Sequence, residues 1–247
     1  MNSPQIFIGI LILVHNAPEY VEITIRSLNE MTNSPPHEVI VLDNASGEET
    51  RRLLRSLHSE GLIDKLHFSE TNTLFAGGNN LAASLASEDA SHFLLLNSDV
   101  EVKNAAWLDR LVENHRRGAT AYGIAQDPLR VDGYCLLVDA DLYREYPLDE
   151  GHQWWWSVTK QQAQLLNSGC RVAGFYEHEE YLHHFGGKSG SAFASAKGMN
   201  VTRREVYAWF GGRKPVVLDN LPRLPLSQRL RALGRRAKWR FASWRRD

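Results

Sequence analysis

The chain has 247 residues, of which 43% are hydrophobic and 23% are charged, so its composition excludes a wholly disordered chain and a fibrous repeat. A chain of this length can bury a core without a metal or a disulfide, and two cysteines, Cys135 and Cys170, are too few for a disulfide framework or a four-cysteine zinc site. The cysteine count fits a reducing compartment such as the cytoplasm. The net charge of -1 hides an asymmetry, because residues 223–247 contain nine Lys or Arg and one acid.

Apolar runs and amphipathic helical stretches alternate along the first half of the chain. The pattern predicts strands at Ile6–Val14, His37–Leu42, Lys65–Phe68 and His92–Leu96, and helices at Pro18–Met31, Glu48–Glu60, Ala76–Ser87 and Ala105–Arg117. The first run is too short for a membrane span, which needs ~20 apolar residues, and it lacks the flanks of a signal peptide, so we expect a buried strand. The alternation predicts an α/β domain with a mostly parallel sheet flanked by helices, in which ligands bind beyond the carboxyl ends of the strands.

The second half of the chain is less regular. We expect a strand at Val131–Val138, a helix at Val158–Asn167 and a loop at Glu177–Gly190.

Polar side chains follow three of the expected strands. They are His15 and Asn16 after the first strand, Asp43 and Asn44 after the second, and Asn97 and Asp99 after the fourth. Asp43 could accept hydrogen bonds from a nucleotide base or ribose, or it could cap the next helix. Asp99, with Asn97, could bind a divalent metal that bridges a diphosphate, or the segment could be an ordinary turn.

A glycine pair opens the third expected helix, in Gly77-Gly78-Asn79-Asn80. Glycines permit close approach of the backbone, and a helix N-terminus favours phosphate, although packing alone also explains such glycines. The segment is not a P-loop, because the Gly-Lys-Ser/Thr that defines one is absent.

The order and spacing of these segments resemble the family 2 glycosyltransferases of GT-A fold, of the type that builds bacterial surface polysaccharides. The resemblance lies in Val-His-Asn-Ala-Pro-Glu-Tyr, Val-Leu-Asp-Asn-Ala-Ser, Ala-Gly-Gly-Asn-Asn and Leu-Leu-Leu-Asn-Ser-Asp-Val, and it covers roughly residues 5–115. It implies a donor site for a nucleoside-diphosphate-sugar made by His15, Asn16, Asp43, Asn44, Gly78, Asn79 and Asn97. It also implies that Asp99 is a ligand of a divalent cation, Mg²⁺ or Mn²⁺.

A later segment, Tyr181 to Ser189, looks like the His-x-Gly-Gly-x-Ser element of the same family. The resemblance implies that His184 belongs to the metal or diphosphate site. It also implies that Lys188 could neutralise the charge of the donor phosphates. The alternative is a solvated loop, because the ten histidines are spread over the whole chain.

The chain departs from the family in the acceptor half, where many members carry a Glu-Asp pair. The helix leading to Gly169 opens without acids, and inverting transfer needs a general base for the acceptor hydroxyl. Asp149 and Glu150 are the nearest substitutes, with Asp139 and Asp141 further back, although a charged loop explains any one of them better.

Three consecutive tryptophans, Trp154, Trp155 and Trp156, open this helix. Aromatic faces stack on sugar rings, so we expect an acceptor platform here; core packing is the alternative. The three cannot all face one way on a helix, and we therefore expect at least one of them to lie near the acceptor and one or two to be buried.

Leucines at 226, 230 and 233 form a helical stripe among arginines, which predicts a basic amphipathic helix on an anionic membrane surface. Docking of this helix on the body of the protein is the alternative. We expect no binding to nucleic acid, because a basic domain face would be needed.

These features predict three regions: a nucleotide-sugar-binding half at 1–118, an acceptor half of the same GT-A domain at 119–215, and a membrane-associating tail at 216–247. The expected protein is cytoplasmic and peripheral to the inner face of the cell membrane. It would move a hexosyl or deoxyhexosyl group to a hydroxyl of a lipid-linked glycan or surface polysaccharide such as lipopolysaccharide. Two alternatives are a non-catalytic saccharide-binding protein and a sugar nucleotidyltransferase; the latter needs a Gly-rich loop with a basic residue, which Val14–Tyr20 lacks.

Overall fold

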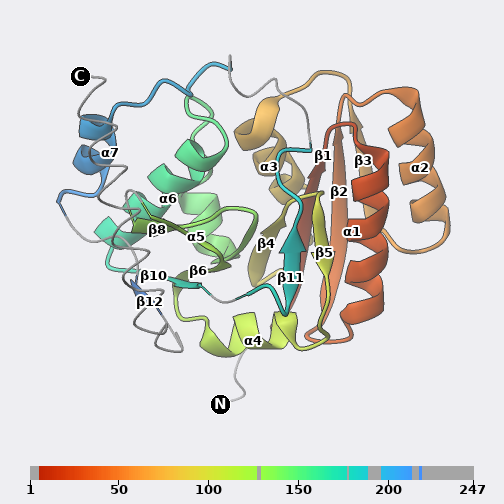
Figure 1. Cartoon of the computed structure of the whole chain (residues 1–247), viewed down its shortest axis with the longest axis horizontal. Helices are drawn as coiled ribbons and strands as arrows, with labels where there is room; N and C mark the ends of the chain where they lie inside the picture. The colour runs from red at the N-terminus through yellow and green to blue at the C-terminus, as the bar shows by residue number, and fades with distance from the viewer. Residues whose placement is uncertain (1–5, 127–128, 177, 189–195, 213–216, 219–247) are drawn as a thin grey trace.

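An eight-stranded sheet forms the centre of the computed structural model, which describes residues 6–126, 129–176, 178–188, 196–212 and 217–218 (Figure 1). Its strands, in spatial order, are β12 (Val217–Leu218), β10 (Arg171–Phe175), β6 (Gly118–Tyr122), β9 (Cys135–Asp139), β4 (His92–Leu96), β1 (Ile8–Val14), β2 (His37–Asn44) and β3 (Lys65–Ser69). Within this sheet only β9 runs antiparallel to its neighbours. The mostly parallel sheet expected from the sequence is confirmed.

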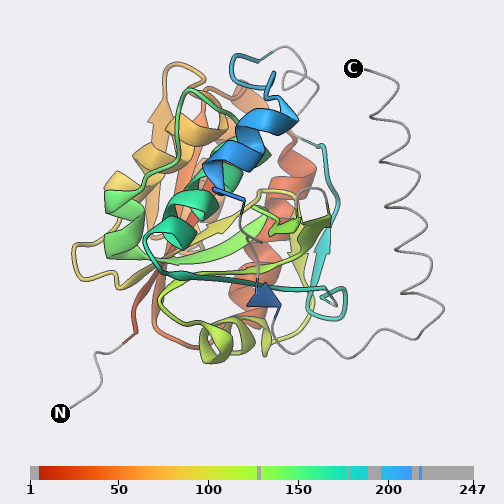
Figure 2. The ribbon, with the colours of Figure 1, turned by 90° about the vertical axis from the view of Figure 1, so that its left-hand side faces the viewer.

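Helices cover both faces of this sheet, as Figures 1 and 2 show. One face packs against α1 (Pro18–Met31), α2 (Glu48–Ser59) and α4 (Trp107–Asn114), and the other against α3 (Leu74–Ser84), α5 (Ala140–Glu145) and α6 (Trp155–Asn167). α7 (Arg203–Trp209) packs on the outside of α6.

The two apolar layers explain the uninterrupted apolar run of β1. Ile10 and Ile12 belong to the core beneath α1, whereas Leu11 belongs to the core beneath α3, and all three are fully buried. A strand covered on both faces needs apolar side chains at every position rather than at alternate ones. Each buried aliphatic side chain of this kind contributes roughly 1.5–3 kcal/mol to folding.

Two small antiparallel sheets lie beside the main one. β5 (Val100–Val102) pairs with β11 (Leu182–His184), and β7 (Ile124–Gln126) pairs with β8 (Leu129–Val131). The expectation of a loop throughout 177–190 is therefore wrong at β11, because pairing with β5 supplies the order that the local sequence does not indicate (Figure 1).

The single strand expected at Val131–Val138 is wrong as well, because a turn divides it into β8 and β9. Gly133 lies in this turn against α6, where an added Cβ would come within 2.8 Å of a Val158 methyl group. The close packing of turn and helix requires a glycine there.

Among the residues that the structure describes, no helix has the length and apolar character needed to cross a membrane. The basic amphipathic helix expected within 216–247 lies outside the described residues, apart from the two that form β12.

Candidate active site

A cavity of about 330 Å³ opens at the carboxyl ends of β1, β2 and β4. This volume lies at the lower end of the range for small-molecule sites in proteins. Its lining includes nine polar or acidic side chains, which are His15, Asn44, Asn72, Asn79, Asn97, Ser98, Asp99, Asp132 and His184. Leu13, Leu74, Phe75, Leu96, Tyr134, Trp154, Trp155 and Val158 supply the apolar and aromatic part of the wall.

Asp99 and His184 meet at one wall of this cavity. The antiparallel register of β5 and β11 pairs His184 with Val100, the residue after Asp99. His184 Nε2 consequently lies 3.2 Å from Asp99 Oδ1 and 3.4 Å from Asn97 Nδ2. The Asp99 side chain is only 6% exposed, so the carboxylate faces the cavity from a nearly buried position.

Tyr134 fixes the orientation of the His184 ring. The two rings stack with centroids 4.4 Å apart and an interplanar angle of 14°. Tyr134 is held in turn by its carbonyl, which accepts a hydrogen bond from the Asn97 N–H, and by its hydroxyl, which lies 2.8 Å from His178 Nδ1. Burial raises the pKa of Tyr134 far above its usual value, so the hydroxyl stays neutral.

Four of the expected donor residues, His15, Asn44, Asn79 and Asn97, line the cavity. Asn44 holds the neighbouring loop in place: its side-chain oxygen accepts the N–H of Thr73, and its amide donates to Asn72 Oδ1. Its backbone carbonyl lies 3.0 Å from His15 Nδ1. The ends of β1 and β2 and the start of α3 are thus joined by one polar network.

Asp43 lies beside this network but does not line the cavity. Its side chain is fully buried, accepts the N–H of Ser46, and pairs with Arg51 Nε at 3.0 Å. These contacts organise the turn between β2 and α2. Asp43 does not cap α2 as the alternative expects, because the N-cap of that helix is Gly47, which has no side-chain cap.

Asn16, Gly78 and Lys188 also lie outside the lining. The side-chain oxygen of Asn16 accepts a hydrogen bond from the Gly47 N–H. Lys188 Nζ lies 5.0 Å from the centre of the Tyr20 ring. At Gly78 an added Cβ would lie 2.4 Å from a Leu13 methyl carbon, so this glycine permits close packing of α3 on β1.

The three tryptophans separate into two groups. Trp154 and Trp155 line the cavity, and Trp155 is 39% exposed. Trp156 points the other way, because its indole N–H donates to the Met199 carbonyl and its ring packs beside α7. Two tryptophans therefore contribute to the wall of the cavity, and none of the three is fully buried, so the burial expected for one or two of them is wrong.

The carboxylates suggested as bases, Asp149 and Glu150, do not line the cavity. Asp149 forms an ion pair with Lys160 and contacts His152 Nδ1 at 3.2 Å, and Glu150 accepts a hydrogen bond from Asn80. The pKa of Asp149 is below its usual value: burial alone would raise it, but hydrogen bonds from Lys160 and the Gly151 N–H outweigh burial.

Asp132 is the acidic residue that the sequence reasoning missed. It lines the cavity, is half-buried, and accepts a hydrogen bond from the Gly133 N–H at 2.7 Å. It lies in the turn between β8 and β9, and the antiparallel β9 begins opposite Leu96, the last residue of β4, so this turn reaches the cavity. The Asp-Gly dipeptide is a turn signal that could have divided the expected strand at this point.

Backbone strain gathers around the cavity. All five non-glycine residues with positive φ in the described part of the chain occur where β1 or β2 ends or where α3 or α6 begins; they are Asn16, Ala17, Ala45, Leu74 and Trp154. Such conformations cost roughly 1–3 kcal/mol each and cluster at functional sites.

A mostly parallel sheet flanked by helices, with a cavity at the carboxyl ends of its strands, is the architecture of the GT-A class of glycosyltransferase fold. The sequence profile of the family described as "Glycosyl transferase family 2" matches residues 9–145. The chain belongs to this family. A search of curated proteins finds no match.

Solved structures show the same fold. A mannosyltransferase from Pyrobaculum calidifontis, PcManGT in complex with GDP-Man and Mn²⁺, is 16% identical and has a TM-score of 0.58, with 67% of this chain and 53% of that chain covered. S. aureus TarS 1-349 in complex with UDP is 15% identical and has a TM-score of 0.52, with 65% and 55% covered. The chain therefore spans about half the length of these two proteins.

Proposed function

We propose that the chain transfers a sugar from a nucleoside-diphosphate donor to a hydroxyl group of a glycan acceptor. The observation that carries this proposal is the composition of one cavity: Asp99 and His184 on one wall, and the Trp154 and Trp155 rings on another. The first pair suits the charged diphosphate of a donor, and the tryptophans suit a sugar ring.

A divalent cation fits the Asp99 wall. Asp99 offers a nearly buried carboxylate, and His184 and Asn97 place an imidazole and an amide within 3.4 Å of one another. Mg²⁺ and Mn²⁺ prefer oxygen ligands such as the Asp99 carboxylate, and they bind substrate phosphates at the same time. When bound, the cation would stabilise the diphosphate leaving group as a Lewis acid. PcManGT, which has this fold, was solved with GDP-Man and Mn²⁺.

The donor would lie along His15, Asn44, Asn72 and Asn79, whose amides and imidazole can hydrogen-bond to a nucleoside and its phosphates. Asp43 and Asn16 remain proposed nucleoside ligands. Both lie at the ends of β1 and β2, and either would reach a donor only by exchanging the backbone contacts described above.

Asp132 is the base that we propose for the acceptor. As the acceptor oxygen bonds to the anomeric carbon and the bond to the diphosphate breaks, Asp132 would take the hydroxyl proton. Apart from Asp99, it is the carboxylate in the cavity lining, and its contact with the Gly133 N–H orients it. The hydrogen-bonded and ion-paired positions of Asp149 and Glu150 make them poorer candidates.

We further propose that the acceptor is a lipid-linked saccharide of a bacterial surface polysaccharide and that the enzyme acts at the cytoplasmic face of the cell membrane. The basic tail supports this setting, since nine cations in 25 residues would bind anionic headgroups. A hexosyl or deoxyhexosyl donor suits the cavity volume.

The experiment is a panel of nucleoside-diphosphate sugars, uridine and guanosine forms among them, assayed for release of the nucleotide with Mn²⁺, with Mg²⁺ and after chelation. We expect release with one donor class and none after chelation. Asp99→Asn should abolish the metal dependence, whereas Glu30→Gln, an exposed change on α1, should not. Metal-dependent binding in a thermal-shift assay, without release of the nucleotide from any donor, would favour the non-catalytic saccharide-binding alternative. The absence of acidic residues at the start of α6 supports that alternative.

A further inference from the structure

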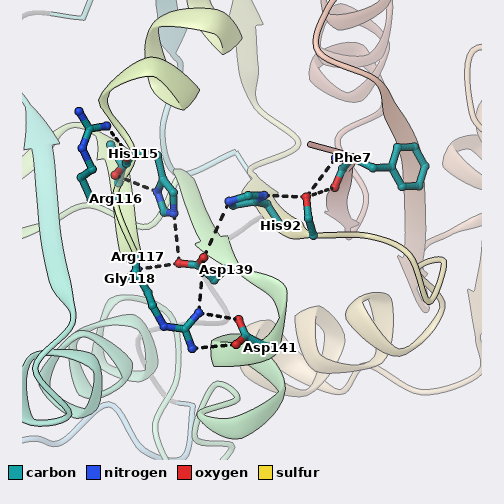
Figure 3. A network of polar contacts seen from close by, with 10 residues as sticks. Phe7, His92, His115, Arg116, Arg117, Gly118, Asp139 and Asp141 are labelled. Carbon is teal, nitrogen blue, oxygen red and sulfur yellow. Dashed lines mark hydrogen bonds and ion pairs between the residues drawn. The ribbon is translucent and has the colours of Figure 1, made fainter. Parts of the chain in front are cut away.

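A second group of potential metal ligands lies at the opposite end of β4 from the cavity. It consists of His92, His115 and Asp139, whose ligand atoms all lie within 4.8 Å of one another (Figure 3). His92 begins β4, Asp139 ends β9 and is its antiparallel partner, and His115 follows α4. At about 3.3 Å per residue, His92 lies about 13 Å from Leu96 at the cavity, so this group is separate from Asp99.

Hydrogen bonds at Ser91 determine which nitrogen of His92 carries a proton. The Ser91 hydroxyl donates its one hydrogen to the Phe7 carbonyl at 3.0 Å and accepts the Phe7 N–H at 3.0 Å. It also lies 2.8 Å from His92 Nδ1, and with the hydroxyl hydrogen directed to the Phe7 carbonyl, Nδ1 is the donor in that contact. In the neutral ring, Nε2 therefore carries a lone pair.

The Nε2 atom of His92 faces the Asp139 carboxylate, as Figure 3 shows. His92 Nε2 lies 3.9 Å from Asp139 Oδ1, which is too long for a hydrogen bond. Among the residues that the structure describes, Oδ1 accepts no hydrogen bond; His115 Nε2, at 3.1 Å, and the Gly118 N–H both contact Oδ2. Two electron-rich atoms thus face each other across a gap that a cation can bridge.

We propose that His92, His115 and Asp139 bind a first-row transition-metal ion of the Zn²⁺ type. Such an ion takes bonds of about 2.0–2.2 Å to imidazole nitrogen and carboxylate oxygen, which puts neighbouring ligand atoms about 3.3 Å apart in a tetrahedron. The separations of 3.1 and 3.9 Å lie on either side of this value. Metal-bound histidines usually donate their second N–H to a fixed partner, and here Ser91 Oγ and Thr120 Oγ1 occupy the Nδ1 positions.

The nearby positive charge of Arg117 does not occupy the proposed position of the ion. Arg117 is the nearest fixed positive charge, but its guanidinium bonds to Asp141 at 2.7 Å and stays 3.9 Å from Asp139 Oδ1. The His92 and Asp139 side chains are 15% and 16% exposed, so an ion can enter from solvent. The ion would tie β4 and β9 to the turn between α4 and β6. It is a structural site, and its presence is independent of sugar transfer.

The test uses the full chain without a histidine tag and with the Asp99→Asn change, so that the cavity does not contribute. Titration with Zn²⁺, and with Co²⁺ as a spectroscopic probe, should show one ion per chain and the intense visible absorption of tetrahedral Co²⁺. His92→Gln should weaken the affinity at least tenfold, whereas His67→Gln, an exposed change on β3, should leave it unchanged.

Three results would overturn the proposal. They are octahedral Co²⁺ absorption like that of the free ion, a sulfur-to-cobalt charge-transfer band that places the ion on Cys170, and equal Zn²⁺ affinity in the His92→Gln and parent chains. The absorption spectrum of the parent chain decides the matter even where a variant fails to fold.

Discussion

Asp132 and Asp43 show how differently two aspartates near one site can be used. Asp43 is fully buried and already bonded to Arg51 and Ser46, whereas Asp132 faces the cavity with one backbone partner. An aspartate with spare lone pairs toward a ligand can accept a proton from it, whereas a saturated one mainly orders the chain around it.

We expect Asp132→Asn to lower the rate of sugar transfer by 10²–10⁴-fold, because the amide cannot take the acceptor proton. The affinity for the nucleotide should stay within about twofold, since binding relies on other walls of the cavity. Steady-state kinetics with titration of the nucleotide separate these effects, and Asp149→Asn is the matched control. An unchanged rate in Asp132→Asn, with a large loss in Asp149→Asn, would move the base to Asp149.

For Asp43→Asn we expect an unfolding free energy lower by about 1–3 kcal/mol, because the charge-assisted bonds to Arg51 and Ser46 weaken. Nucleotide affinity should fall at least tenfold in addition. Arg51→Met is the control, because it removes the same ion pair and keeps the carboxylate. If both variants lose stability and neither loses affinity, Asp43 is structural only.

At the scale of elements, the strands with a clear local signal were predicted well. The bounds expected for α1 and β4 agree with the structure, and those of β2, α2 and β3 differ by one or two residues. Two-sided burial gives these strands apolar runs, and glycine or charge marks their ends. β5, β8 and β11 were missed or merged because three-residue strands get their order from a distant partner rather than from their own sequence.

Residues of the candidate site were likewise predicted where a parallel strand places them and missed where an antiparallel strand does. His15, Asn44, Asn97 and Asp99 follow parallel strands, so the rule that ligands bind at carboxyl ends located them. Asp132 precedes an antiparallel strand, where that rule does not apply. The pairing of His184 with Asp99 could be expected only from the family resemblance, since nothing in the local sequence predicts that β11 joins β5.

Glu38 on β2 links three elements by charge. It pairs with Lys65 Nζ of β3 at 2.9 Å and accepts the N–H and hydroxyl hydrogens of Ser87 after α3. Burial alone would raise the pKa of Glu38, but the bonds from Ser87 and Lys65 outweigh it and lower the pKa below its usual value near 4.5.

A carboxylate whose pKa is lower in the folded state stabilises the fold above its unfolded pKa, and this contribution disappears as the pH falls through the folded value. Glu38→Gln should therefore lower the unfolding free energy by about 1–2 kcal/mol at pH 7. The difference from the parent chain should shrink below about pH 4.5. Denaturant titrations across this range, with Glu30→Gln as the exposed control, measure it; a difference independent of pH would contradict the assigned charge effect.

On the scale of the whole molecule, the charges of the chain are separated along its length. The residues proposed for donor, metal and acceptor all lie before 190, whereas nine cations lie after 222. A chain arranged in this way can hold the proposed catalytic body and the proposed membrane attachment as separable parts.

Removal of residues 223–247 should release the protein from anionic liposomes but preserve transfer to a short soluble acceptor. Binding of the full chain should weaken as salt rises, because the Debye length is only about 10 Å at 0.1 M salt. Co-sedimentation with melting curves for both chains measures this. Loss of the fold on truncation, or indifference of the full chain to anionic liposomes at low salt, would show that the tail is part of the body instead.

The pairing of β11 with β5 has a consequence for the order in which the site is made during synthesis. Asn97 and His184 are separated by 87 positions, so a ribosome adding about 5–20 residues per second completes this wall of the cavity roughly 4–17 s after its first residues appear. In that interval the nascent chain has the β1, β2 and β4 ends but not the histidine beside Asp99. The emerging polypeptide therefore cannot assemble the proposed metal site at Asp99 until His184 has been translated.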